Sequence, residues 1–188
     1  MKETISNRII WNSAAKTALV FAAVTVACNL LKRGIVALDL PAFVMTLLSG
    51  LVWAAEFFGC ICLMAFFMKK LVRDYDGVLN TDTYKYGRRI ALLSAILIAS
   101  TEFLILYLSP EEKLQEMIDS MLSAYVSMLD SNTLSVMEDT LQNLPAITFV
   151  SNLIYCFLYG TVLSAILSRR IPMPDPFADV PSSDTENE

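Results

Sequence analysis

Four long apolar runs, at residues 9–31, 43–67, 90–108 and 146–167, constrain this chain more than any other feature. Each is about as long as the 17–25 residues with which a helix crosses roughly 30 Å of hydrocarbon. Hydrophobic residues make up 55% of the chain and charged residues only 18%, against about 25% charged residues in an ordinary soluble domain. The sequence therefore predicts an all-α integral membrane protein, with one domain over residues 1–171 built as a four-transmembrane-helix bundle.

The composition also limits the kinds of catalytic and metal-binding sites that the chain can form. The chain has no histidine, which removes the commonest general base and the commonest metal ligand. Its four cysteines all fall inside the apolar runs, where thiols usually serve as packing residues. With no nucleophile motif either, we expect a protein that is not an enzyme and needs no metal or cofactor. We expect the lipid bilayer, and no nucleic acid, as a partner.

Basic residues predict the orientation, because cytoplasmic loops of membrane proteins carry an excess of lysine and arginine. If both termini and the segment between the second and third runs are cytoplasmic, 11 of the 14 basic residues lie inside. Only Lys32 and Arg33, in the expected first loop, and Lys113, in the expected third loop, then lie outside. We therefore expect a multi-pass protein of the bacterial inner membrane, with its N- and C-termini in the cytoplasm.

A second interpretation of the first run stays open. The residues Thr25 to Cys28 loosely resemble a bacterial lipoprotein cleavage site that follows a basic segment and a short apolar segment. If Cys28 were lipidated, the mature chain would keep three spans in the same orientation.

The segment between the third and fourth runs predicts two amphipathic helices outside the membrane. Pro110 and two following glutamates suit a helix start, and apolar residues then recur at helical spacing up to Leu144. These helices, within residues 110–144, form either a lid on the bundle or a surface for self-association or a membrane-protein partner. The acidic, proline-rich residues 172–188 have the composition of a disordered tail.

The segment between the second and third runs is basic and is expected to form a loop with a turn at Asp76-Gly77. Attraction to anionic lipid head groups is expected from its cationic side chains. The residues expected to make this contact are Lys69, Lys70, Arg73, Arg88 and Arg89.

The same segment carries a family resemblance. Lys69-Lys70, Arg73-Asp74, Gly77 and residues 84–87, together with Pro110 and the final Arg169-Arg170, resemble the bacterial domain-of-unknown-function 4199 family of four-pass membrane proteins. The resemblance implies a four-helix inner-membrane protein and transfers no activity.

Two carboxylates interrupt the apolar runs, Glu56 in the second and Glu102 in the third. Measured from the cytoplasmic ends of these runs, both lie roughly 17–18 Å up the helix at 1.5 Å per residue. They are therefore expected to share one level in the bundle. No cation is expected at that level, so burial and mutual repulsion would favour protonated carboxyls.

Small and polar residues at helical spacing predict the faces where helices meet. The two amides on these faces, Asn29 and Asn152, complete a candidate intramembrane polar site with Glu56 and Glu102. The other predicted contact residues are Ala15, Ala18, Ala22 and Thr25 in the first run, Ser49, Gly59 and Cys60 in the second, Ala91, Ala95 and Ala99 in the third, and Cys156, Gly160, Ser164 and Ser168 in the fourth.

Three hypotheses for the carboxylates remain open at this point. They are neutral hydrogen-bonding groups that hold helices together, a proton- or cation-responsive site on a transport path, or the counter-charge of a partner protein. The favoured function is a non-enzymatic assembly or accessory protein. The alternative is a small oligomeric proton- or cation-linked transporter or channel.

Overall fold

The computed structural model describes residues 6–38, 40–123, 136, 141 and 143–171, and these form an all-helical protein without strands. The long helices are α1 (Asn7–Val36), α2 (Ala42–Asp74), α3 (Asn80–Tyr107) and α6 (Leu144–Arg170), and a shorter helix α4 spans Glu111–Ser123. All four long helices are long and apolar enough to cross a membrane. The predicted all-helical fold class is confirmed, with four helices that could serve as the predicted spans.

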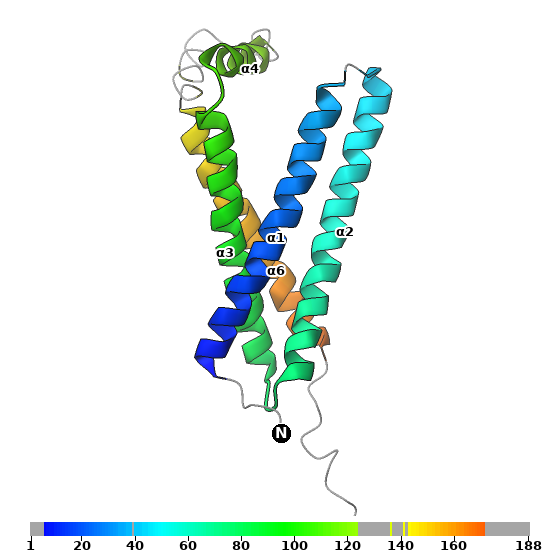
Figure 1. Cartoon of the computed structure of the whole chain (residues 1–188), viewed down its shortest axis with the longest axis vertical. Helices are drawn as coiled ribbons and strands as arrows, with labels where there is room; N and C mark the ends of the chain where they lie inside the picture. The colour runs from blue at the N-terminus through cyan, green and yellow to red at the C-terminus, as the bar shows by residue number, and fades with distance from the viewer. Residues whose placement is uncertain (1–5, 39, 124–135, 137–140, 142, 172–188) are drawn as a thin grey trace, which may run out of the picture.

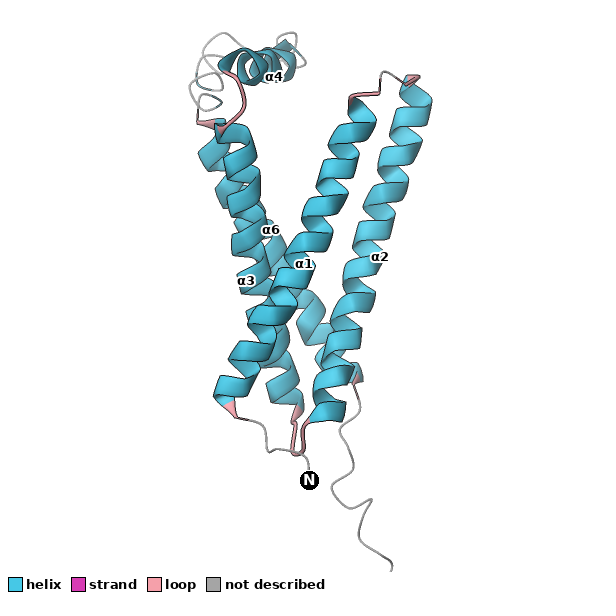
Figure 2. Cartoon of the chain, in the orientation of Figure 1, coloured by secondary structure: helices cyan, strands magenta, loops and turns pink. Residues whose placement is uncertain are grey.

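The four long helices alternate in direction (Figure 1). α1 and α3 run away from the end of the bundle where the N-terminus lies, and α2 and α6 run back toward it. The α1–α2 connection and α4 therefore lie at one end, and the α2–α3 connection lies at the other (Figure 2). We call the first the α4 end and the second the N-terminal end.

The helices extend beyond the apolar runs, which corrects two predictions. Lys32 and Arg33, expected in the first loop, belong to the last turns of α1. The expected loop between the second and third runs is mostly helical, because α2 continues to Asp74 and α3 begins at Asn80. The reason is that lysine and arginine are good helix formers, so a helix can continue after the apolar run ends.

The short connection of residues 75–79 depends on one glycine. Gly77 has φ +71°, a left-handed conformation that glycine adopts without the steric cost imposed by a Cβ atom. The turn predicted at Asp76-Gly77 is confirmed. α3 then starts with the Asp82 carboxylate accepting a hydrogen bond of 3.3 Å from the backbone N–H of Leu79.

Helices α3 and α6 make the closest contact in the bundle. A Cβ atom added to Gly160 would lie 2.5 Å from the Cβ of Ala91, so no larger residue fits there without movement. A Cβ atom on Gly87 would lie 2.4 Å from the hydroxyl oxygen of Ser164. Small residues thus bring these two backbones together, as they do in many membrane bundles.

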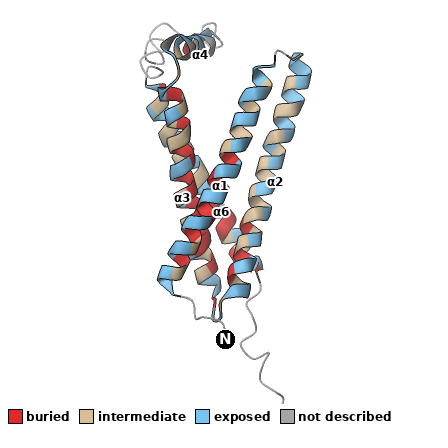
Figure 3. Ribbon diagram, viewed as in Figure 1, coloured by how far each residue is buried: buried red, intermediate tan, exposed pale blue. Residues whose placement is uncertain are grey.

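The packed core lies toward the N-terminal end, and α1 and α2 diverge from α3 and α6 toward the α4 end (Figure 3). The buried residues of α2 are Met64, Met68 and Leu71, all in its second half. They pack with Phe21 of α1 and with other buried residues of α1, α3 and α6 in one apolar cluster. The first half of α2 has no buried residue.

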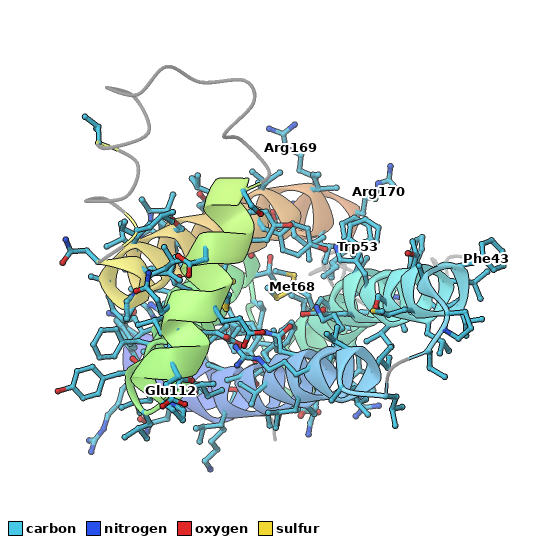
Figure 4. All side chains as sticks on the ribbon, turned by 90° about the horizontal axis from the view of Figure 1, so that it is seen from above. Phe43, Trp53, Met68, Glu112, Arg169 and Arg170 are labelled. Carbon is cyan, nitrogen blue, oxygen red and sulfur yellow. The ribbon has the colours of Figure 1, made fainter. Side chains whose placement is uncertain are left out.

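α4 begins directly after Pro110, as predicted, and lies crosswise above the ends of α3 and α6 (Figure 4). The Ser109 hydroxyl donates a 2.7 Å hydrogen bond to the Ile105 carbonyl, so it bonds to the end of α3 and not to the start of α4. Most of the predicted second amphipathic helix and all of the predicted tail, residues 172–188, lie outside the described residues.

Candidate functional site

The last turns of α1 present a polar face to the neighbouring helices. Asn29, Lys32 and Arg33 stand three and four residues apart, which places them on one side of the helix. Each makes a hydrogen bond to a carboxylate of another helix. This face of α1 therefore supplies hydrogen-bond donors to both Glu56 and Glu102.

Glu56 of α2 forms an ion pair with Lys32. The ammonium nitrogen lies 2.7 Å from Oε2 of the carboxylate, and the two side chains are 29% and 16% exposed. Helical side chains lean toward the N-terminus of their own helix. Because α1 and α2 run in opposite directions, the side chains of Lys32 and Glu56 lean toward each other.

Glu102 of α3 has two partners on α1. Its Oε1 accepts a hydrogen bond of 3.0 Å from the Asn29 side-chain amide, and its Oε2 accepts a hydrogen bond from the Arg33 guanidinium. The Glu102 side chain is only 10% exposed. A carboxylate buried to this degree needs such partners, because an unpaired charge in a water-poor site is strongly unfavourable.

These contacts correct the sequence interpretation of the carboxylates. The prediction that no cation lies at the level of Glu56 and Glu102 is wrong, because Lys32 and Arg33 pair with them. The prediction failed because it placed both cations in the first loop. The reason given for neutral carboxyls therefore disappears. Glu56 and Glu102 pair with adjacent residues of α1 and so approach the same part of that helix.

A cavity of about 250 Å³ lies beside the Lys32–Glu56 pair. Its wall includes residues of all four long helices, and Asn29, Glu56 and Asn152 of the predicted site are among them. Glu102 is not a lining residue, and it is linked to the cavity through its hydrogen bond with Asn29. Three of the four predicted site residues therefore share one cavity, and the fourth lies directly behind it.

Aromatic rings form much of the cavity wall. Trp53 and Phe57 of α2 are stacked with ring centroids 5.6 Å apart, and Phe57 lies 5.6 Å from Tyr159 of α6. Tyr155 stacks on Tyr159 at 6.4 Å. The cavity thus combines one carboxylate and one ammonium with the faces and edges of several rings.

The predicted contact faces agree with the structure on α3 and α6. Ala91, Ala95 and Ala99 are buried, as are Gly160 and Ser164. On α1, Ala18, Ala22 and Thr25 are buried as predicted, but Ala15 is exposed and Ala14 is buried in its place. On α2, Gly59 is exposed, and a Cβ atom there would meet nothing within 4 Å, so this glycine marks no close helix contact.

The residues predicted to contact lipid head groups all lie near the N-terminal end, on the last turns of α2 and the first turns of α3. Lys69, Lys70 and Arg88 are exposed. Arg73 pairs with Asp74 at 3.5 Å. Arg89 is held by the Asn7 side chain at 2.5 Å, and its guanidinium lies 4.7 Å from the Trp11 ring.

The sequence interpretation missed Lys32, Arg33 and the aromatic wall. A signal for the two cations was present in the sequence. No proline follows the first apolar run until Pro41, so the helix was free to continue through Lys32 and Arg33. For the rings, the signal was their spacing of four residues in both Trp53/Phe57 and Tyr155/Tyr159.

No group of three or more histidine, cysteine, aspartate or glutamate residues in the described part of the chain could hold a metal ion. All four cysteines are free thiols. No protein-family model, curated protein or solved structure matches the chain, so the family resemblance stays a prediction.

Proposed function

We propose that the protein is a small transporter or channel of the bacterial inner membrane that takes a cation into the cavity beside Glu56. The cavity is the observation that carries this proposal, because all four long helices line it and an ionisable pair lies on its wall. In membrane proteins, ionisable residues that face a cavity commonly mark a path for ions or substrates. Both termini are assigned to the cytoplasm by the distribution of basic residues.

The charge and shape of the cavity favour a cation as the ligand. Glu56 provides a counter-charge, and the rings of Trp53, Phe57 and Tyr159 can provide cation–π contacts. Lys32 occupies the position that a bound cation would take. A cation that contacts the rings as well as the carboxylate can compete with the Lys32 ammonium for Glu56.

Trp53 offers a direct test, because it lies on the cavity wall and the chain has only one other tryptophan, Trp11. In Trp11→Phe protein, titration with tetramethylammonium should change the Trp53 fluorescence in a saturable manner. Glu56→Gln should abolish this change, and Lys32→Met should increase the affinity several-fold. Glu112→Gln, in the exposed part of α4, is the charge-matched control and should have no effect.

Two results would contradict cation binding. One is a fluorescence change that survives Glu56→Gln, and the other is the absence of any saturable change. Flux of the same cation into proteoliposomes then separates a transporter from a protein that only binds the cation.

The function that the sequence favoured, a non-enzymatic assembly or accessory protein, is supported by a different observation. The first half of α2 has no buried residue, and its Phe43, Leu47 and Leu51 are exposed. A second copy, or a helix of another membrane protein, could cover this surface. Such a partner could also bind through residues 110–144. Native mass spectrometry in mild detergent tests this hypothesis, which requires a homo-oligomer or a co-purifying membrane protein. A monomer without any bound chain would count against it.

A further inference from the structure

A second cavity, of about 300 Å³, lies between α1, α2 and α3 near the N-terminal end of the bundle. It is separate from the Glu56 cavity and shares no lining residue with it. Its polar wall includes Ser13, Lys16 and Thr17 of α1, Lys70 and Asp74 of α2, and Tyr86 of α3. The proposed function does not use any of these residues.

The charge of this cavity is positive. Neither the Lys16 nor the Lys70 ammonium has a salt-bridge or hydrogen-bond partner among the described residues. The one lining carboxylate, Asp74, already pairs with Arg73 at 3.5 Å. Two uncompensated cations, both on exposed residues, therefore line the rim of one cavity.

The direction of the helices brings the two lysines together. Lys16 on α1 leans toward the N-terminal end, while Lys70, on the antiparallel helix α2, leans away from it. Both side chains can therefore reach into the space between the helices. Flexible lysine side chains, each with three N–H donors, suit an anion of compact shape.

Hydroxyl groups complete the polar wall. The Tyr86 side chain is only 1% exposed, and its hydroxyl lies 2.8 Å from the Thr17 hydroxyl and accepts a 3.3 Å hydrogen bond from Ser13. This network holds three hydroxyls at the wall. Two of the three hydroxyl protons are used within this network, so one hydroxyl, that of Thr17 or Tyr86, can donate to a phosphate oxygen beside the two ammonium groups.

The same cavity also has apolar lining residues, Val20, Phe67 and Leu71. A site with cations, hydroxyls and an apolar part between membrane helices has the character of pockets that bind anionic lipid head groups. We propose that this cavity binds a phosphate ester, with Lys16 and Lys70 as its cationic ligands. An anionic phospholipid is one source of that group, and a soluble phosphate ester is the other.

The neighbouring basic residues provide a matched control. Lys69 and Arg88 are exposed at the same end of the bundle, as Lys16 and Lys70 are, but they do not line the cavity. They would attract anionic membranes through general surface charge. The double variant Lys69→Gln/Arg88→Gln therefore removes the same charge as Lys16→Gln/Lys70→Gln but leaves the cavity intact.

The test is native mass spectrometry of the full chain in a neutral detergent, with titration of dioleoylphosphatidylglycerol and, as a neutral lipid, dioleoylphosphatidylcholine. We expect one phosphatidylglycerol molecule to bind in preference to phosphatidylcholine. Lys16→Gln/Lys70→Gln should weaken this binding at least tenfold, and Lys69→Gln/Arg88→Gln should change it less than twofold. Lys16→Arg/Lys70→Arg should restore it, which separates loss of binding from loss of folding.

A second arm replaces the lipid with glycerol 3-phosphate and inorganic phosphate. If these soluble phosphates bind as tightly as phosphatidylglycerol and depend on the same two lysines, the phosphate site stands and its ligand is soluble. The proposal is overturned if no phosphate compound binds. It is also overturned if the two double variants weaken phosphatidylglycerol binding equally, because general surface charge then explains the attraction.

Discussion

The side-chain amide of Asn29 on α1 donates a 3.0 Å hydrogen bond to Oε1 of Glu102 on α3. Through this bond, a residue on the cavity wall is fixed by a carboxylate that does not itself line the cavity. Arg33 holds the other oxygen of the same carboxylate. The orientation of Asn29 therefore depends on an ion pair behind it.

The first prediction concerns this contact. Asn29→Ala should lower the free energy of unfolding by about 1 kcal/mol, in the range of hydrogen bonds between membrane helices. Unfolding of the detergent-solubilised protein by titration with sodium dodecyl sulfate gives the measurement. Glu102→Ala, which removes the acceptor oxygens, and the double variant complete a thermodynamic cycle. A coupling energy near zero would contradict a direct bond between the two side chains.

The second prediction concerns the contact between α3 and α6. Gly160→Ala should destabilise the protein by about 1–3 kcal/mol, because its Cβ would lie 2.5 Å from the Cβ of Ala91. Gly59→Ala is the matched control, since that position is open and alanine favours helix more than glycine by up to about 1 kcal/mol. Thermal unfolding should therefore shift in opposite directions for the two variants. Equal shifts would show that α3 and α6 do not approach at Gly160.

The third prediction concerns the turn between α2 and α3. Gly77→Ala should destabilise the protein by roughly 1–2 kcal/mol, because a left-handed backbone places a Cβ atom too close to the following carbonyl oxygen. Gly34→Ala, inside α1 and without close neighbours, should be neutral or slightly stabilising. Both variants can be measured in one denaturation series. A neutral Gly77→Ala would mean that the turn does not need its positive φ.

The fourth prediction concerns orientation in the membrane. In a variant without its four cysteines, Leu38→Cys and Leu79→Cys place exposed thiols in the α1–α2 and α2–α3 connections. A membrane-impermeant maleimide should label position 38 from outside the cell and position 79 only in inverted membranes. The reason is the excess of basic residues at the N-terminal end. The reverse pattern would place both termini outside the cytoplasm.

Regular helical periodicity made much of the fold predictable. The four apolar runs indicated four spans, and the stripe from Gly160 to Ser168 repeats every four residues and lies buried in α6. The α1 face was harder to predict, because alternating steps of three and four residues also fit a neighbouring face. The structure buries Ala14 where the sequence suggested Ala15.

The ends of the helices were not predictable from the apolar runs, and this affected the candidate site. An apolar run gives the length of the helix that can lie in hydrocarbon. It does not give the residue at which the helix ends, because polar residues can continue the same helix. For α1 the difference covers Lys32 and Arg33, which pair with Glu56 and Glu102. The four polar residues could be identified from the sequence, but the pairing of the two carboxylates with Lys32 and Arg33 was missed.

The polar contacts of α1 with both α2 and α3 have a consequence for the order in which the protein is made. Helices of a nascent chain emerge from the N-terminus onward. When α1 enters the membrane, Lys32 lacks its partner until α2 arrives, and Asn29 and Arg33 lack theirs until α3 arrives. The Thr17 hydroxyl likewise lacks its hydrogen-bond partner, the Tyr86 hydroxyl, until α3 arrives. The polar groups of α1 are therefore satisfied in two steps during synthesis, and the second step requires more than half of the chain.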